Sequence, residues 1–267
     1  MERIINKIKI FSNNNKKSKD IEIYLKKILS KNKFKIVDKN YDLAIAIGGD
    51  GSFLRMLKYN NFNSNVFYIG INAGTLGFLQ EVKPEEIKDF VYKLNNNDFK
   101  IEEVGIQETI VSSNDSNSIF YSLNEIVIRD LELNTIKMDI EIDNEKLESF
   151  VGDGLLISTS VGSTAYNLSF GGSIVYNNFH TLQITPIAPL NNKSYRNLVN
   201  SIIIPENLTI TLYPSKKTTD LIVTIDGENK KYTDVIRIET LVRDKKIKCI
   251  RTENYNYTKI INEKFLT

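Results

Sequence analysis

The chain has few of the residues that form disulfides and metal centres. Its 267 residues include a single cysteine, Cys249, and a single histidine, His180. One cysteine excludes an internal disulfide and a metal site built from cysteine ligands. One histidine allows at most one histidine-dependent catalytic pair, so acid–base chemistry in an enzyme of this sequence would rest on carboxylates. We expect Cys249 to be a buried strand residue and His180 to be structural.

The sequence also lacks long apolar runs and a strong net charge. No run reaches the length of about 20 apolar residues that a membrane helix needs. The first residues contain no secretory hydrophobic region with a cleavage site. A formal net charge of +2 gives no electrostatic support to nucleic-acid or membrane binding. We therefore expect a cytoplasmic protein that binds neither nucleic acid nor a membrane.

The first third of the chain alternates between short apolar runs and amphipathic stretches. Strands are expected at residues 8–12, 34–37, 43–47 and 66–71. Helices are expected after an N-cap at Ser18, over residues 52–58, and from Pro84 to residue 94. Strands and helices in alternation are typical of an α/β domain with a mostly parallel sheet. We place this domain at residues 1–98.

Residues 99–240 are rich in strand-like apolar runs and poor in helical periodicity. This pattern predicts an all-β domain, with two packed sheets or an irregular sandwich. The stretch SSNDSNS, residues 112–118, is typical of a hairpin tip. Residues 241–267 hold one more strand candidate and a short amphipathic end, which we expect to pack back on the first domain.

The stretch LAIAIGGDGSFL, residues 43–54, joins a buried strand to a helix through three glycines and one aspartate. Successive glycine N–H groups can form a nest for phosphate oxygens, and the helix that follows points its positive end at the same place. An aspartate there would not bind phosphate, because like charges repel. It would act on a hydroxyl as a base or orienter, or on a metal ion. Alone, the motif is equally typical of a tight glycine turn.

Three further stretches combine polar residues with strands or tight loops. The pair Asn124-Glu125 interrupts an apolar strand, residues 152–159 read GDGLLIST, and residues 162–172 read GSTAYNLSFGG. Each alone fits an ordinary turn or helix cap. Together with GGDG, and in this order, they resemble the NAD kinase family. Two more stretches match that family, GTLGFL at residues 74–79 and TPIAP at residues 185–189.

The resemblance spans residues 43 to about 206 and implies both a fold and a reaction. The fold would be an α/β N-terminal domain with a mostly parallel sheet plus an all-β C-terminal domain, as in NAD kinases and diacylglycerol kinases. The reaction would transfer the γ-phosphoryl of ATP to the 2′-hydroxyl of the adenosine ribose of NAD, giving NADP. Where the family usually has Pro-Thr before the GSTAY segment, this chain has Ser160-Val161.

The resemblance also implies a site. Asp50 is the expected catalytic base, because a secondary hydroxyl is a poor nucleophile that a nearby carboxylate can orient and deprotonate. The expected phosphate-binding residues are Gly48, Gly49 and Gly51. Mg²⁺ or another divalent cation would accompany ATP and need few protein ligands, so no side chain is assigned to a metal. The expected NAD-binding residues are Asp50, Gly51, Phe78, Asn124, Glu125, Asp153, Thr164, Ala165, Tyr166 and Ser169.

Several of these residues have a chemical rationale. Asn124 can pair with an adenine edge, Glu125 can accept hydrogen bonds from ribose hydroxyls, and Phe78 and Tyr166 offer flat apolar surfaces. In the family, the DG…GSTAY segment comes from a neighbouring subunit. The resemblance therefore implies a homodimer or homotetramer whose active site is completed by a neighbour, with residues 99–240 forming the NAD-binding and oligomerisation domain.

Two alternatives remain at this point. A diacylglycerol-type lipid kinase shares GGDG and a β-domain, but the GSTAY loop and the Asn124-Glu125 pair argue against it. A dinucleotide-binding regulator without catalysis is the second alternative. Asp50 argues for chemistry, because a pure binder needs no base beside a phosphate nest.

Overall fold

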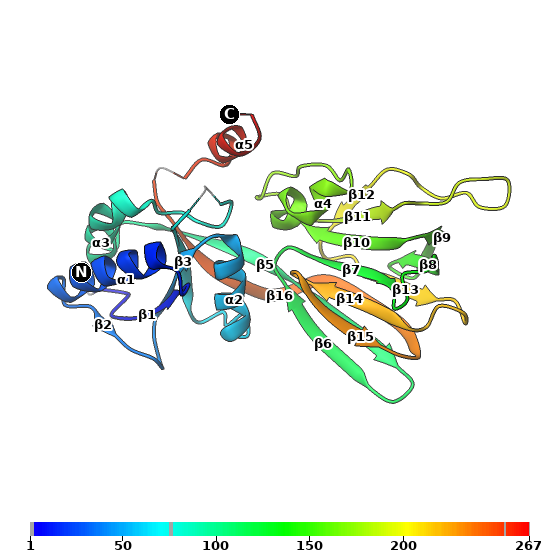
Figure 1. Ribbon diagram of the computed structural model, residues 1–267, viewed down its shortest axis with the longest axis horizontal. Helices are drawn as coiled ribbons and strands as arrows, with labels where there is room; N and C mark the ends of the chain where they lie inside the picture. The colour runs from blue at the N-terminus through cyan, green and yellow to red at the C-terminus, as the bar shows by residue number, and fades with distance from the viewer. Residues whose placement is uncertain (1–2, 75–76, 254, 267) are drawn as a thin grey trace. The chain divides into compact units, whose positions relative to one another are not determined.

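The computed structural model describes residues 3–74, 77–253 and 255–266 (Figure 1). The chain forms two compact units, one made of Met1–Val104 with Lys246–Thr267 and the other of the residues between them, 105–245. Two long strands, β5 (Lys100–Ser113) and β16 (Val235–Arg251), contain the points where the chain leaves one unit for the other. The domain boundaries expected from the sequence are residues 98 and 240. The first lies just before β5, and the second lies inside β16. In the described part of the chain, no helix has the length and apolar character needed to cross a membrane.

The first unit is built on a parallel sheet. Its strands run in the order β2-β1-β3-β4, and the last residues of β16 pair in parallel with β4. The strands are β1 (Lys7–Ser12), β2 (Lys35–Ile36), β3 (Leu43–Gly48) and β4 (Phe67–Asn72). All residues of β3 are buried, as expected of a central parallel strand flanked by helices. The predicted α/β domain is confirmed.

Helices separate these strands along the chain, and a last helix follows β16. They are α1 (Lys16–Lys31), α2 (Asp50–Tyr59), the short 3₁₀ helix η1 (Pro84–Glu86), α3 (Ile87–Asn95) and the C-terminal α5 (Tyr257–Phe265). After β1 the chain moves to one edge of this strand order, where it forms β2. After β3 it moves in the opposite direction, where it forms β4. Because both crossovers are expected to be right-handed, α1 and α2 lie on opposite faces of the sheet. The strand order therefore reverses between β1 and β3, where open α/β sheets bind ligands.

The start of α1 corrects one prediction. Ser18 is not the N-cap, because Asn15 holds that position and its Oδ1 accepts a hydrogen bond from the backbone N–H of Ser18 at 2.8 Å. Asparagine and serine are similarly good caps, so the local sequence allowed either choice. Ser18 instead lies in the first turn, where its hydroxyl is buried without a hydrogen-bond partner.

The second unit is built from antiparallel strands in two sheets that share one core. One sheet has the order β12-β11-β10-β7-β14-β15, with β7 (Glu125–Asp130), β10 (Gly154–Thr159), β11 (Thr181–Ile187), β12 (Ile202–Pro205), β14 (Leu221–Ile225) and β15 (Glu228–Tyr232). The other contains β5 and β16 with β6 (Asn117–Ser122), β8 (Ile136–Ile142), β9 (Glu145–Gly152) and β13 (Ile210–Pro214). Apolar side chains of both sheets pack in a single cluster, which confirms the predicted arrangement.

The second unit also contains a hairpin tip and a short helical segment. Ser112 pairs with Asn117 across the β5–β6 turn, so residues 112–118 do form a hairpin tip. The segment after β10 forms a 3₁₀ helix, η2 (Val161–Thr164), and one helical turn, α4 (Tyr166–Ser169).

Candidate active site

The Asp50 side chain is held by backbone amides from a distant loop. Asp50 begins α2 directly after the Gly49 N-cap. Its Oδ2 accepts a hydrogen bond from the N–H of Phe78 at 3.0 Å, and its Oδ1 accepts one from the N–H of Leu79 at 2.9 Å. A Cβ on Gly77 would lie 2.2 Å from Oδ1, so only glycine lets this loop approach the carboxylate. The GTLGFL stretch thus fixes the direction of the Asp50 carboxylate, although its Thr75 and Leu76 lie outside the described residues.

The glycines around Asp50 are of two kinds. Gly48 has φ +156, and a Cβ there would lie 2.2 Å from the hydroxyl of Ser52, so the fold itself requires glycine. A Cβ on Gly49 would meet no atom within 4 Å, and one on Gly51 would meet only the end of Arg55, at 3.6 Å. The fold does not need glycine at these two positions. Their missing side chains leave open space at the N-terminus of α2, where the helix dipole favours an anion.

A cavity of about 400 Å³ lies beside this helix start, where the strand order reverses. Its wall includes Asn13 after β1 and both Ser52 and Arg55 of α2. The Nη2 of Arg55 donates to Asn13 Oδ1 at 2.6 Å and to Ser52 Oγ at 3.1 Å, which holds the guanidinium at the cavity edge. Asn13 and Arg55 were not among the residues expected from the sequence. The run of three asparagines at residues 13–15, directly after a strand, was the available signal.

In the second unit, a turn aspartate fixes the Asn124-Glu125 pair. Asp226, in the turn between β14 and β15, accepts hydrogen bonds from the backbone N–H groups of Leu123 (2.9 Å), Asn124 (2.8 Å) and Glu125 (3.3 Å). These bonds set the position at which β7 begins. Asp226 was not among the residues expected from the sequence, although the IDGE turn that contains it has the Asp-Gly pair seen in the other motifs.

Glu125 is a buried carboxyl with an unused oxygen. The residue is 6% exposed, and its Oε2 has no hydrogen-bond partner. Burial, followed by the negative charge of Asp226, raises the pKa of Glu125 to about 8, and a hydrogen bond from the backbone N–H of Tyr166 opposes that rise. A buried polar atom without a partner is rare in folded proteins. Such an atom is suited to a ligand that donates hydrogen bonds.

The GSTAY segment packs against the Asn124 backbone. A Cβ on Gly162 would lie 2.1 Å from the carbonyl oxygen of Asn124, so glycine is required for this approach. Thr159 strengthens the junction, because its Oγ1 donates to the carbonyl of Leu123 at 2.6 Å and accepts from the N–H of Gly162 at 3.1 Å. The end of the segment is fixed as well, since a Cβ on Gly172 would collide with the buried Asn167 side chain at 2.3 Å.

Ser160 stands where the family usually has proline, and its backbone has the conformation that a proline would impose. Its φ is −57°, close to the value of about −65° to which a proline ring is fixed. The hydroxyl of Ser160 supplies contacts that a ring cannot make: it accepts from the N–H of Thr181 at 3.3 Å and donates to the carbonyl of Phe179. The loop is therefore tied to the start of β11 by hydrogen bonds.

The expected site residues divide between the two units. The first unit contains Gly48, Gly49, Asp50, Gly51 and Phe78. The second unit contains Asn124, Glu125, Asp153, Thr164, Ala165, Tyr166 and Ser169. Within the second unit, the GSTAY residues adjoin Asn124 and Glu125, with Tyr166 and Ser169 exposed. Asp153 is exposed between β9 and β10.

Phe78 has neighbours that the sequence did not indicate. Its ring centroid lies 6.2 Å from that of Tyr257 and 5.5 Å from that of Phe265, both in α5. The C-terminal helix therefore packs on the loop whose amides hold Asp50.

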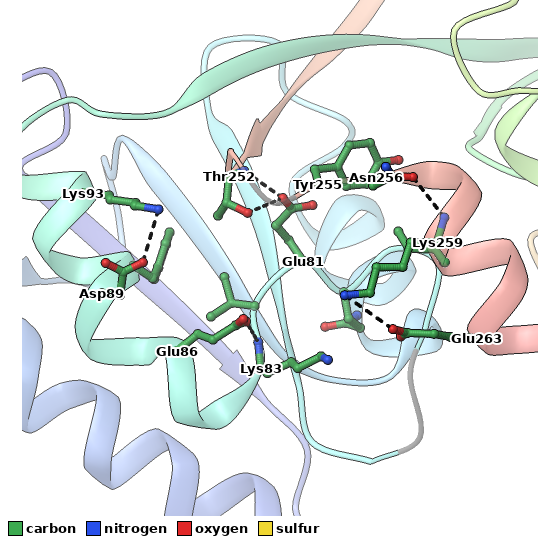
Figure 2. Close-up of a pocket in the computed structure, with 14 residues that line it drawn as sticks. Glu81, Lys83, Glu86, Asp89, Lys93, Thr252, Tyr255, Asn256, Lys259 and Glu263 are labelled. Carbon is green, nitrogen blue, oxygen red and sulfur yellow. Dashed lines mark hydrogen bonds and ion pairs between the residues drawn. The ribbon is translucent and has the colours of Figure 1, made fainter. Parts of the chain in front are cut away.

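A second cavity of the first unit, like the one beside α2, is lined by none of the expected site residues. It has a volume of about 100 Å³ and lies between α3, the residues after β4 and α5 (Figure 2). Four of its charged side chains form two ion pairs, Lys93 with Asp89 at 3.2 Å and Lys259 with Glu263 at 3.7 Å. Over residues 3–74, 77–253 and 255–266, no group of three or more His, Cys, Asp or Glu side chains could hold a metal ion.

Neither His180 nor Cys249 belongs to the candidate site. His180 is exposed and its Nδ1 lies 3.2 Å from Glu206. Cys249 is buried in β16, as predicted, and burial raises the pKa of its thiol.

Comparisons with known proteins agree with these motifs. Residues 6–99 match the family model of the ATP-NAD kinase N-terminal domain, and residues 123–251 match that of the ATP-NAD kinase C-terminal domain. The chain is 36% identical to the NAD kinase of Finegoldia magna over 267 residues, which cover 97% of each chain. It is 31% identical to the NAD kinase of Staphylococcus epidermidis over 232 residues, which cover 86% of each.

Solved structures show the same fold. A yeast NADH kinase complexed with NADH superposes with a TM-score of 0.88 at 22% identity, covering 100% of this chain and 89% of the other. An NAD kinase from Archaeoglobus fulgidus in complex with ATP gives a TM-score of 0.72 at 19% identity, covering 97% and 98%. The predicted fold class and the resemblance are both confirmed. The chain therefore belongs to the NAD kinase family, and it is an enzyme that phosphorylates NAD to NADP with ATP.

Proposed function

We propose that Asp50 is the base of this phosphoryl transfer. The observation that carries the proposal is a carboxylate held by two backbone amides, beside two glycines whose missing side chains leave space at a helix N-terminus. The carboxylate accepts the proton of the ribose 2′-hydroxyl as that oxygen forms a bond to the γ-phosphorus. The bond between the γ-phosphorus and its bridging oxygen to the β-phosphate breaks, and ADP leaves with that oxygen.

The donor is proposed to bind as a complex of ATP with Mg²⁺ or another divalent cation. Gly49 and Gly51 would leave room for its phosphates at the start of α2, and together with Gly48 they would present N–H groups to them. The cavity of about 400 Å³ supports a donor on this side, because Arg55 at its edge can neutralise phosphate charge. Most ligands of the cation would be phosphate oxygens and water, because Mg²⁺ keeps several waters and needs few protein ligands.

NAD is proposed to use the residues of the GSTAY segment and of the β7 start. Glu125 Oε2 would accept a hydrogen bond from a ribose hydroxyl, which gives this buried oxygen the partner it otherwise lacks. Asn124 would pair with the adenine edge. Tyr166 would offer its exposed ring, and Asp153, Thr164, Ala165 and Ser169 would add contacts along the dinucleotide. Phe78 and Gly51 complete the proposed set.

A homodimer or homotetramer completed by a neighbouring subunit is part of the proposal. Its support is the set of exposed apolar side chains in the stretch from α4 to β12, among them Ile174, Tyr176, Phe179, Leu198, Val199 and Ile203. Large apolar side chains that a protein leaves exposed are typical of subunit interfaces where they form one patch. Light scattering coupled to size-exclusion chromatography tests the oligomer. Mixing inactive Asp50→Asn with inactive Tyr166→Ala subunits tests the shared site, because a hybrid would regain activity only if the two residues act from different chains.

The decisive experiment follows transfer of labelled phosphate from ATP to NAD, with diacylglycerol as a competing acceptor. We expect label in NADP and none in lipid. Asp50→Asn should retain NAD binding and lose turnover by about 10²–10⁴-fold, the usual contribution of a general base. Unchanged turnover would mean that Asp50 is not the base. The same assay, run with NADH and with polyphosphate, defines the range of acceptors and donors, and fractionation of the source cells tests the expected cytoplasmic location.

A further inference from the structure

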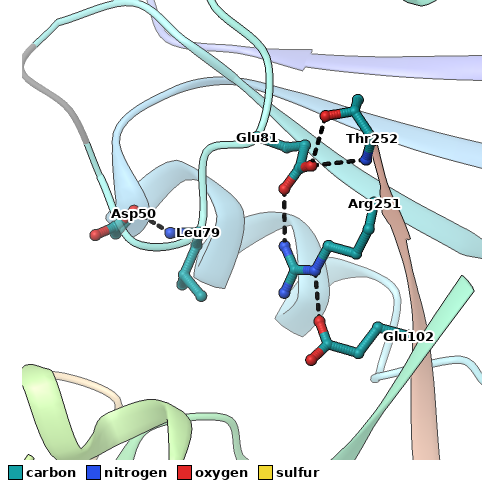
Figure 3. Close-up of polar contacts among 6 residues, drawn as sticks. All are labelled: Asp50, Leu79, Glu81, Glu102, Arg251 and Thr252. Atoms are coloured by element: carbon teal, nitrogen blue, oxygen red, sulfur yellow. Dashed lines mark hydrogen bonds and ion pairs between the residues drawn. The ribbon is translucent and has the colours of Figure 1, made fainter. Parts of the chain in front are cut away.

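A buried ion-pair network joins the end of β16 to the loop after β4 (Figure 3). The Nη1 of Arg251 lies 3.2 Å from Glu81 Oε2, and its Nε donates to Glu102. The other oxygen of Glu81 accepts hydrogen bonds from the N–H of Thr252 at 2.7 Å and from its hydroxyl at 2.9 Å. The side chains of Glu81 and Arg251 are only 2% and 13% exposed. Every oxygen of the Glu81 carboxylate is therefore bound to the end of β16.

Stability alone does not account for this network. Burial raises the pKa of Glu81, and the neighbouring Arg251 and Thr252 oppose that rise. A buried ion pair of this kind is often no more stabilising than apolar residues of the same volume. What a buried, fully bonded pair does supply is a fixed position for the backbone that carries it.

The backbone that carries Glu81 also carries the amides that hold Asp50. Glu81 follows Leu79 by two residues, and Leu79 N–H donates to Asp50 Oδ1 (Figure 3). Two residues of chain span at most about 7 Å, so a shift at Glu81 is transmitted to the Leu79 amide. The Glu81 N–H also donates to the carbonyl of Gly70 in β4, at 3.0 Å, which leaves this short segment little freedom.

We propose that Arg251 is a positioning residue for the phosphoryl transfer. By fixing Glu81, it holds the Phe78 and Leu79 amides at the place where they orient the Asp50 carboxylate. Arg251 is not catalytic in this proposal, because it acts through Glu81 and the loop. The proposal rests on the role of Asp50 given above.

The test compares Arg251→Met and Glu81→Gln with a control, Arg243→Met. Arg243 also pairs with a glutamate, Glu108 at 2.7 Å, but it is 55% exposed and lies in the other unit. Misplacement of a reacting group by about 1 Å costs about 10²-fold in rate. We expect kcat to fall by about 10–100-fold in both network variants, with KM for NAD changed less than about threefold and the control unaffected. Arg251→Lys should recover part of kcat, because one ammonium group can hold Glu81 or Glu102.

A second readout needs no activity. Hydrogen exchange of the Phe78 and Leu79 amides, measured in the protein without substrates, should be faster in Arg251→Met and Glu81→Gln than in the wild type. Arg243→Met should leave it unchanged. If Arg251→Met does not fold, Glu81→Gln carries the test, since it keeps the shape of the side chain and a carbonyl oxygen for Thr252.

The two ways to fail are distinguishable. Unchanged turnover in Asp50→Asn contradicts the proposed role of Asp50, and the exchange measurement still tests the positioning role of Arg251. An active wild type, together with folded variants whose kcat and amide exchange match it, overturns the positioning role and leaves Asp50 as the base.

Discussion

Replacing Glu125 with glutamine should change how stability depends on pH. In the folded state the pKa of Glu125 is raised to about 8 by burial and by Asp226, against an ordinary value of 4.5. A carboxyl with a higher pKa in the folded state binds its proton more tightly there than in the unfolded chain. The free energy of unfolding therefore falls as pH rises from 4.5 towards 8, and it levels off above 8.

The size of this effect follows from the two pKa values. Each pH unit between them is worth about 1.4 kcal/mol, so ionising Glu125 costs the fold at most about 5 kcal/mol at pH above 8. Glutamine has nearly the same shape and no charge to bury. We expect Glu125→Gln to be more stable than the wild type above pH 8 by a few kcal/mol, and to differ little from it near pH 4.5.

Denaturant unfolding across this pH range measures the difference. The control is Glu145→Gln, which removes an exposed carboxyl at the start of β9. The free energy of unfolding of Glu145→Gln should change with pH in parallel with that of the wild type. That of Glu125→Gln should diverge from the wild type as pH rises. If the wild type and Glu125→Gln lose stability equally between about pH 5 and 8, Glu125 is not the group that titrates, and the reasoning from its burial is wrong.

Four further substitutions have clear expected outcomes. Gly77→Ala places a Cβ 2.2 Å from the Asp50 carboxylate, so NADP formation should fall by about 10²-fold or more, and unchanged turnover would contradict the geometry. Gly49→Ala meets open space, so thermal unfolding should be unaffected while KM for ATP rises; a change in unfolding alone would refute a phosphate role. Asn15→Ala should cost about 1 kcal/mol in denaturant unfolding, and Ser18→Ala should cost nothing because its hydroxyl has no partner; the reverse order would restore Ser18 as the cap.

The sequence predicted the fold class and the family because both are encoded in local patterns. The buried strand β3, the GGDG turn and the strand-rich second part can each be recognised within a window of a few residues. The choice between Asn15 and Ser18 as a cap could not be predicted, since both residue types cap helices and only the path of the chain decides. The continuous β16 was also missed, because the charged residues 243–246 interrupt its apolar pattern.

The contacts that support the candidate site had no local signal, even where the residues themselves stand in a recognisable pattern. Leu79 meets Asp50 across 29 positions, Asp226 meets Asn124 across 102, and Arg251 meets Glu81 across 170. No periodicity or turn pattern relates residues so far apart in a single sequence. The motifs therefore indicated which side chains carry chemistry, and only the structure indicated what holds them.

The division of the chain into units has a consequence for its synthesis. The second unit, residues 105–245, is one continuous segment that can fold as soon as it has left the ribosome. The first unit is discontinuous: its sheet lacks the β16 edge beside β4, and its loop lacks Arg251 and α5, until residues 246–267 have been added. The aspartate that begins α2 is translated early, yet Arg251, which holds its loop through Glu81, is translated long after it. A nascent or prematurely terminated chain should thus acquire its β-rich unit before it acquires a competent phosphate site.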